Sequence, residues 1–340
     1  MHRQANYITI VYLTVFIAGC SLQRQPAKDS APMTYNRMLQ QEFARINNYS
    51  WKVYCAADYY TYTFPADSQF RQNNISELNL TLFNRDFKTE STQGTATLIR
   101  QSPSQRLFLS CYHIFNYPDT LVDYYYRDDG TKTPFIAHLS IKQKQIQFVK
   151  KYNTTVLVDI AAFDKKEDIT FLVAEQTNPD SSPELFRMQI IHPGLVKTGT
   201  QAYVTGFPAG YAMVTSGLLS KPFPDRPGKI MIDASFNKGY SGAPFFVVSP
   251  DCRCFRLAGI ITSSASEQKN ILVPEFQSHR KIYNPRSIYT HPSFVKLDES
   301  IKYGITYTTS ITTIKDFYIN HQHTLNEKNI SLEEFFHLER

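Results

Sequence analysis

Three side chains in this sequence are of the types that acyl transfer to a serine requires. Ser241 lies between two glycines in the stretch FNKGYSGAPFF, a composition that is typical of a tight turn. His113 lies near the end of the apolar run LFLSCYHIF, and Asp168 opens the alternating run DITFLVAE. In this chemistry an imidazole takes the hydroxyl proton, a carboxylate orients the imidazole, and backbone N–H groups receive the oxyanion. The three residues are therefore a candidate nucleophile, base and acid.

Short strands are the elements that would position these side chains. Runs rich in Val, Ile, Thr, Tyr and Phe alternate with clusters of Asp, Asn, Gly, Pro and Ser, which predicts an all-β barrel or sandwich. We expect strands at 51–64, 94–99, 106–115, 155–163, 168–175, 201–207, 229–236, 243–248 and 257–262. Apolar residues at helical spacing predict helices at 34–46, 312–321 and 331–340.

Six segments in one order give the chain a family resemblance. They are GTATLI, SCYHIF, DIAAFDKKEDITFLVAE, YVTGFPAGYAMVTSGLLSK, IDASFNKGYSGAPFF and YGITYTTSITTIKDF. Together with the chain order His, Asp, Ser they resemble the trypsin-like peptidases, most closely the bacterial HtrA/Deg branch. The resemblance runs roughly from Trp51 to Phe317. It implies two six-stranded antiparallel β-barrels of the chymotrypsin type with a C-terminal helix, and a serine endopeptidase activity.

The resemblance assigns the catalytic triad to His113, Asp168 and Ser241. Asp159 is an alternative acid, because it lies in a short Asp-Ile-Ala motif like the one around the family's catalytic aspartate. We prefer Asp168, since the strand TVLVDIAAF then leads into the turn DKKE and the acid opens the next strand. With Asp159 as the acid, the residue would lie in mid-strand and DITFLVAE would have no counterpart.

The same resemblance assigns the oxyanion hole and the substrate pocket. The N–H groups of Gly239 and the nucleophile Ser241 would receive the oxyanion. Ser235, six residues before the nucleophile, would form the pocket floor, with walls from Thr262 and Ser264. An uncharged floor predicts a small or medium uncharged P1 side chain, because an unpaired charge in a desolvated slot is strongly disfavoured. Asp233 is two residues away on the same face of the strand, so it also could reach the pocket.

Two departures from the family pattern support a second hypothesis. Ala243 stands where the family commonly has a second glycine, and Tyr240 where it usually has Asp or Asn. The alternative function is a catalytically inactive trypsin-like lipoprotein that acts as a binding module. The survival of all three catalytic residue types favours the active enzyme. No PDZ-sized segment follows residue 325, so we expect no regulatory module of the HtrA type.

The N-terminal segment predicts export and lipidation. A short basic start is followed by a mostly apolar run from Tyr7 to Ala18, which is typical of a secretory signal peptide and too short for a confident membrane span. The run ends in Ile17-Ala18-Gly19-Cys20, which resembles the bacterial lipobox and implies cleavage before Cys20 and a lipid on its sulfur. Ser21 then makes the outer membrane the expected location, facing the periplasm or the cell surface.

These observations predict four regions. They are a lipoprotein signal peptide at 1–19, a lipidated flexible tether at 20–33, a double-barrel peptidase domain at 34–325 and a helical tail at 326–340. The basic residues are spread out despite a net charge of +6, so we expect no nucleic-acid binding. The expected partners are polypeptide substrates and a membrane reached through the lipid. The sequence leaves the oligomeric state open.

Cysteine usage leaves several pairings open. With Cys20 lipidated, four cysteines remain in an oxidising compartment, and they allow three disulfide connectivities: Cys55, Cys111, Cys252 and Cys254. No paired CxxC motifs occur, and no histidine lies at ligand spacing from Cys252. We therefore expect no metal and no cofactor.

Overall fold

The computed structural model describes residues 31–127, 131–175, 189–220, 228–249, 254–274 and 293–337. The chain divides into two compact units, 1–44 and 45–340, and all the strands belong to the second. The expected signal peptide, Cys20 and Cys252 lie outside the described residues. Among the helices that the structure describes, none is both long and apolar enough to cross a membrane.

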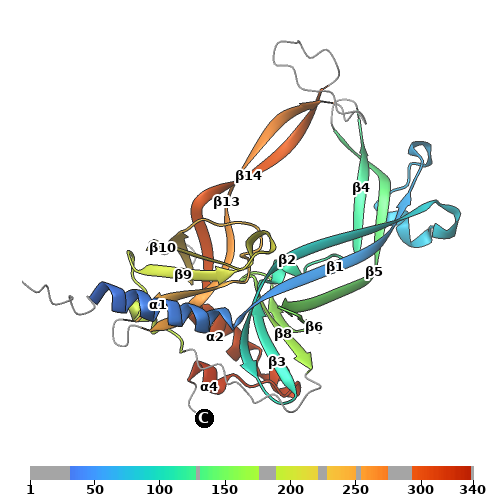
Figure 1. Ribbon diagram of the computed structural model, residues 1–340. Coiled ribbons are helices and arrows are strands. Elements are labelled where there is room, and N and C mark those ends of the chain that lie inside the picture. The colour runs from blue at the N-terminus through green and yellow to red at the C-terminus, as the bar shows by residue number, and fades with distance from the viewer. Residues whose placement is uncertain are drawn as a thin grey trace, which may run out of the picture. The chain divides into compact units, whose positions relative to one another are not determined.

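The first sheet contains eight strands: β1 (Ser50–Thr63), β2 (Arg85–Gln101), β3 (Gln105–Ser110), β4 (Thr120–Tyr126), β5 (Lys132–Lys151), β6 (Thr154–Leu157), β7 (Asp159–Asp164) and β8 (Ile169–Glu175). The strands run in the order β4-β5-β1-β2-β3-β8-β7, with β6 paired to β5, and every pairing is antiparallel (Figure 1). Alternate residues of β1 are buried from Val53 to Tyr59, as expected for a strand with one face on a core.

The second sheet contains six strands: β9 (Gln201–Gly206), β10 (Met213–Ser220), β11 (Lys229–Asp233), β12 (Pro244–Val248), β13 (Phe255–Pro274) and β14 (Ser293–Ser310). They form a closed barrel in the order β10-β11-β14-β13-β12-β9. Aromatic side chains such as Phe245, Phe246 and Phe255 are buried in its core. The distal parts of β13 and β14 continue as a two-stranded ribbon beyond the barrel (Figure 1).

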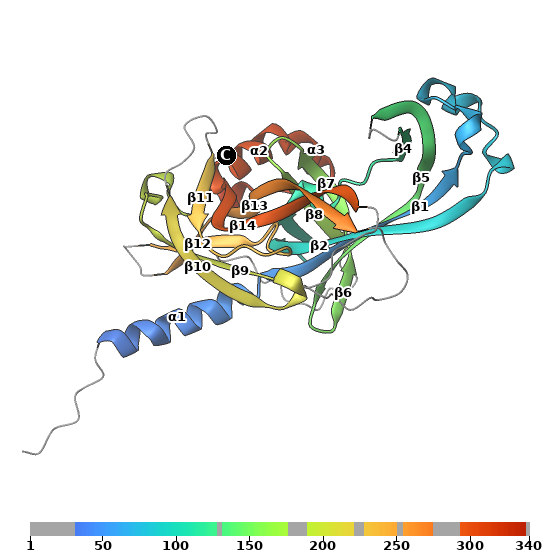
Figure 2. The ribbon, with the colours of Figure 1, turned by 90° about the horizontal axis from the view of Figure 1, so that it is seen from above.

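Four α-helices complete the described structure: α1 (Ala31–Asn47), α2 (Ile311–Asn320), α3 (Gln322–Glu327) and α4 (Glu333–Phe336). The Ser310 hydroxyl caps α2 by accepting a hydrogen bond from the Thr313 N–H at 3.2 Å. Phe317 of α2 packs against Phe171 of β8, with ring centroids 5.1 Å apart. The helix therefore follows the last strand of the barrel and contacts the first sheet (Figure 2).

The all-β class and the C-terminal helix expected from the sequence are confirmed, and the architecture is consistent with a chymotrypsin-like fold. The first sheet differs in detail from a closed six-stranded barrel, because it has eight strands and forms a half-barrel. One cause is the 20-residue strand β5, which pairs with β4 along one part of its length and with β6 at its end. Within the described residues, no pairing closes this sheet.

Candidate active site

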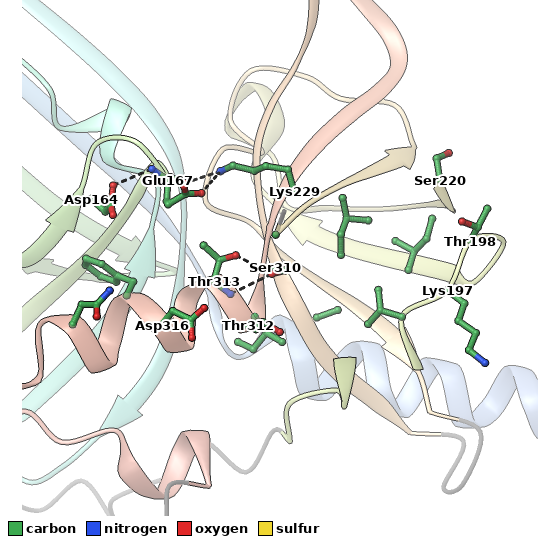
Figure 3. A pocket seen from close by; sticks show the side chains of 18 residues that line it. Asp164, Glu167, Lys197, Thr198, Ser220, Lys229, Ser310, Thr312, Thr313 and Asp316 are labelled. Carbon is green, nitrogen blue, oxygen red and sulfur yellow. Dashed lines mark hydrogen bonds and ion pairs between the residues drawn. The ribbon is translucent and has the colours of Figure 1, made fainter. Parts of the chain in front are cut away.

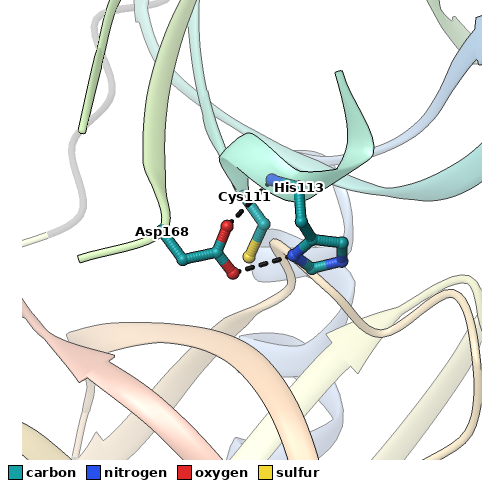
Figure 4. Close-up of side chains that lie close together, drawn as sticks. All are labelled: Cys111, His113 and Asp168. Carbon is teal, nitrogen blue, oxygen red and sulfur yellow. Dashed lines mark hydrogen bonds and ion pairs between the residues drawn. The ribbon is translucent and has the colours of Figure 1, made fainter. Parts of the chain in front are cut away.

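His113 and Asp168 form the best-defined polar contact of the site. His113 lies in a single 3₁₀ turn, Tyr112–Ile114, just after β3. Its Nδ1 lies 2.8 Å from Oδ2 of Asp168, and its backbone N–H donates to Oδ1 of the same carboxylate at 2.9 Å (Figure 4). The backbone contact fixes the position of residue 113, and the contact to Nδ1 fixes the orientation of the imidazole ring. The other ring nitrogen, Nε2, is left to exchange a proton, on a side chain that is 45% exposed.

The turn before Asp168 determines where this carboxylate lies. Asp164 Oδ1 accepts hydrogen bonds from the N–H groups of Lys166 and Glu167, at 2.8 and 3.0 Å. Asp168 itself has a φ of 57°, in the left-handed region that aspartate and asparagine enter more readily than most residues. Asp159 instead lies exposed in β7, opposite Val173, and no hydrogen bond or ion pair joins it to His113 in the part of the chain described. The geometry therefore favours Asp168.

Ser241 lies on a turn that is pressed against the first sheet. The residue is 8% exposed, and its carbonyl oxygen accepts a hydrogen bond from the Thr95 N–H at 2.8 Å. Gly242 follows with a φ of 81°, and a Cβ there would overlap the Thr95 carbonyl oxygen. Only glycine satisfies both the dihedral angle and this close approach without strain. Glycine is therefore required after Ser241, because the turn packs directly against Thr95 of β2 in the first sheet.

The turns that carry His113 and Ser241 meet at one carbonyl group. The Gly242 N–H and the Cys111 thiol both donate to the Ile261 carbonyl oxygen, at 2.8 and 3.2 Å. The Ser241 hydroxyl donates to the Thr262 carbonyl oxygen at 3.5 Å, and no hydrogen bond joins it to His113 among the described residues. Rotation about the serine Cα–Cβ bond redirects this hydroxyl, and catalytic hydrogen bonds are often loose before substrate binds.

Two backbone N–H groups on the Ser241 turn have no hydrogen-bond partner among the described residues. They belong to Gly239 and Ser241, the pair that the sequence assigned to the oxyanion. Their neighbours are bonded, since the Tyr240 N–H donates to the Asn237 carbonyl at 3.1 Å and the Gly242 N–H to Ile261. The alternation leaves two donors available at the turn, which is what stabilisation of a developing oxyanion requires.

Cys111 is a member of this site that the sequence treated only as a disulfide candidate. The thiol is free and fully buried, and Cys55 is likewise free and buried. Cys254 is disulfide-bonded. Burial raises the pKa of the Cys111 thiol well above its usual value, and the nearby Asp168 carboxylate raises it further. Cys111 is therefore a neutral donor, and its position two residues before His113 is the one sequence signal that could have indicated this contact.

The donor atoms of Cys111, His113 and Asp168 all lie within 4.8 Å of one another (Figure 4). Three such atoms could in principle hold a metal ion. However, the Cys111 thiol already donates to the Ile261 carbonyl oxygen at 3.2 Å. The His113 Nδ1 is also engaged by Asp168. The arrangement fits an oriented imidazole better than a metal centre.

Tyr240 has a packing role next to Ser241. The side chain is 2% exposed, and its ring lies 6.4 Å from that of Phe236. Its hydroxyl is buried with no hydrogen-bond partner among the described residues, and burial raises the pKa of the phenol. This position therefore contributes an aromatic ring to the core.

The three expected pocket residues have different environments. Ser235 is exposed, whereas Thr262 is buried and its hydroxyl donates to the Tyr307 carbonyl at 3.3 Å. Ser264 lies opposite Thr306, whose hydroxyl donates to the Ala234 carbonyl at 3.0 Å. Ser264 lies in β13 and the segment before Ser235 follows β11, and β14 lies between these two strands in the barrel. No hydrogen bond joins the three expected residues to one another among those described.

Comparison with known proteins gives a match to a family model and matches to solved structures. A model described as the trypsin-like peptidase domain matches residues 94–249. A crystal structure of an inactive mutant form of Rv3671c from M. tuberculosis aligns with 87% of this chain and 95% of its own, at 11% identity and a TM-score of 0.42. This identity and this TM-score are too low to support a conclusion about function. No curated protein matches the chain. The segment that contains His113, Asp168 and Ser241 is thus similar to the trypsin-like peptidase domain.

Proposed function

We propose that this protein is a serine endopeptidase that cleaves polypeptides through an acyl-enzyme intermediate. Ser241 is the nucleophile, His113 the general base and acid, and Asp168 the carboxylate that orients the imidazole. The observation that carries the proposal is the pair of hydrogen bonds from His113 to Asp168, at 2.8 and 2.9 Å. They lie beside the Ser241 turn, where two N–H groups have no hydrogen-bond partner in the part of the chain that the structure describes. The match to the trypsin-like peptidase domain supports a hydrolase.

The order of the proton transfers follows from the hydrogen bond between Asp168 and the Nδ1 atom of His113. Because Asp168 binds Nδ1 of His113, the other ring nitrogen takes the proton of the Ser241 hydroxyl as Oγ attacks the carbonyl carbon of the substrate. The oxygen of that carbonyl becomes negative and is bound by the N–H groups of Gly239 and Ser241. His113 then donates the proton to the leaving amine, and the C–N bond breaks. Water then attacks the ester carbonyl as His113 takes a proton from it, and His113 returns that proton to the Ser241 oxygen as the ester bond breaks.

Labelling with a fluorophosphonate probe tests this proposal. The serine oxygen displaces fluoride from phosphorus, so one probe group should add to the purified protein and map to Ser241 by mass spectrometry. Ser241→Ala is expected to abolish the label, whereas Ser91→Ala, a change at an exposed serine in β2, should leave the labelling rate unchanged.

The same experiment separates the two functional hypotheses. A folded wild-type protein that takes up no label would contradict the peptidase and support a binding module without turnover. A label that persists in Ser241→Ala would show that another residue is the nucleophile, and would overturn the assignment of the triad.

We further propose that lipid on Cys20 anchors the protein to a bacterial membrane, with the enzyme facing the periplasm or the cell surface. The support is the Ile17-Ala18-Gly19-Cys20 sequence at the end of the apolar run. One acyl chain gives only marginal membrane binding, so stable anchoring needs more than one. Cys20→Ala is expected to move the protein from the membrane pellet to the soluble fraction. Ser21→Ala should stay in the pellet, and a Cys20→Ala protein that also stays there would contradict the lipid anchor.

A further inference from the structure

A lysine of the second barrel reaches across to the turn that carries Asp168. Lys229 lies at the start of β11, and its side chain is 17% exposed. Its Nζ donates to the Glu167 carbonyl oxygen at 2.9 Å (Figure 3). The same Nζ donates to the Thr309 hydroxyl oxygen at 2.6 Å. The Thr309 hydroxyl in turn donates to the same Glu167 carbonyl oxygen, at 3.1 Å. Two donors from the barrel thus converge on one backbone oxygen of the first sheet.

Residue 167 is held at both of its backbone polar groups. The Glu167 N–H is bound by the Asp164 carboxylate at 3.0 Å, and the Glu167 carbonyl by Lys229 and Thr309. This carbonyl belongs to the peptide unit that leads directly into Asp168, whose φ of 57° is uncommon for a residue with a side chain. A sparsely populated conformation persists when its surroundings over-determine it. The hydrogen bonds to the Glu167 N–H and carbonyl hold the peptide before Asp168 in this way.

We infer that Lys229 is a positioning residue for the acid of the triad, which it orients through the Glu167 carbonyl without touching Asp168 by a hydrogen bond. This inference rests on the proposed function. The bond from an ammonium to a carbonyl oxygen is charge-assisted and stronger than a neutral one. Its loss frees the peptide before Asp168, and the carboxylate then no longer meets both His113 Nδ1 and the His113 N–H. Misplacement of a catalytic group by about 1 Å can cost about 10²-fold in rate.

The backbone contact is separable from the ion pair that accompanies it. Lys229 Nζ also lies 3.5 Å from the Glu167 carboxylate, but the carbonyl and hydroxyl contacts are shorter. Glu167→Gln removes the negative charge and keeps the carbonyl oxygen. If Lys229 acts through the backbone, this variant should be close to wild type, whereas Lys229→Ala should not.

A cavity beside Lys229 makes a chemical rescue feasible. It has a volume of about 520 Å³ and is lined by Lys229, Glu167 and Lys197, among others (Figure 3). Propylammonium has the atoms that Lys229→Ala lacks beyond Cβ. Lys197 is exposed on the wall of the same cavity, and its side chain has no hydrogen bond or ion pair among the described residues, so Lys197→Ala is a matched control for removing a lysine there.

The experiment measures the rate constant of fluorophosphonate labelling and the NMR signal of the His113 Nδ1–H, assigned with His113→Ala. Lys229→Ala is expected to label about 10²-fold more slowly, with its Nδ1–H signal shifted or lost, and propylammonium should restore part of both. Lys197→Ala should match wild type, and Glu167→Gln should stay within about threefold of it, since its backbone contact is kept. If Lys229→Ala does not fold, Thr309→Val replaces it in the test. This variant lacks one of the two donors to the Glu167 carbonyl, so its labelling rate should also fall, but by less.

The outcomes distinguish this inference from the proposed function. Unchanged labelling and an unchanged Nδ1–H signal in folded Lys229→Ala would overturn the positioning role. So would a loss in Glu167→Gln as large as that in Lys229→Ala, because the ion pair would then be the relevant contact. If the wild type takes up no label while the Nδ1–H signal still responds to Lys229→Ala, the peptidase proposal fails and the positioning role stands.

Discussion

Replacing Asp168 with asparagine is expected to lower kcat about 10⁴-fold, as the equivalent change does in a Ser-His-Asp triad. The amide has nearly the shape of the carboxylate, so the hydrogen bond from the His113 backbone N–H is retained by its oxygen. The amide nitrogen then faces the His113 Nδ1 and selects the tautomer that carries the proton on Nε2. That tautomer cannot take a proton from Ser241. Asparagine also enters the left-handed region readily, so the φ of 57° adds little strain to the variant.

Steady-state hydrolysis of a peptide substrate gives kcat and KM for the Asp168→Asn variant. KM should change little, because the aspartate binds the imidazole rather than the substrate. Asp159→Asn is the matched control, since this exposed residue of β7 carries the same side chain and lies opposite Val173. A large loss of kcat in Asp159→Asn, with Asp168→Asn close to wild type, would show that the preferred acid is the wrong one.

Part of the strand content could be predicted from the sequence because alternation is a local property, whereas β4 and β5 lie outside every strand expected from the sequence. The run from Trp51 predicts a strand to residue 64, and β1 extends over Ser50–Thr63. The number of strands in a sheet is not local. That β5 continues for 20 residues and pairs with three partners depends on segments far apart in the chain. The sequence therefore predicted the class of the first sheet but not its eight strands.

The segment between Phe64 and Gly94 shows the same limit. No strand or helix was expected from the sequence between these two residues. The structure has three 3₁₀ helices there, at Ala66–Ser68, Gln72–Glu77 and Leu80–Leu82. Apolar side chains of this segment pack with Leu139 of β5 around a small separate core. Single turns of helix have no repeating apolar spacing, so the packing was visible only in three dimensions.

The candidate site was predictable where chemistry restricts residue type. A serine between glycines, a histidine near a strand end and an aspartate after a turn each has a recognisable setting, and the structure places His113 against Asp168. The contact between Lys229 and Glu167 had no such signal. The two residues are 62 positions apart, and each is unremarkable in its own segment. A buried thiol such as Cys111 is likewise identified by its neighbours, not by its sequence.

The second large effect expected is a loss of oxyanion stabilisation in Gly239→Ala. Gly239 has a φ of 110°, and a Cβ at this position would overlap the Phe207 carbonyl oxygen. The overlapped atom belongs to the backbone, so the turn itself has to move. Its displacement also breaks the link in which Thr95 Oγ1 accepts from the Phe207 N–H at 3.1 Å and donates to the Gly239 carbonyl at 2.8 Å. Removal of one oxyanion donor typically costs about 10²–10³ in kcat.

Gly199→Ala is the control that separates backbone strain from the loss of the oxyanion donor. Gly199 has a φ of 83° but nothing within 4 Å of an added Cβ, so its variant experiences the left-handed strain, about 1–2 kcal/mol, without a clash. Both variants should unfold at lower temperature than wild type, and only Gly239→Ala should lose kcat, with KM nearly unchanged. A Gly239→Ala enzyme with wild-type kcat would contradict the role of this N–H. Equal losses of kcat in the two variants would assign the effect to stability, because the strain is the only change that they share.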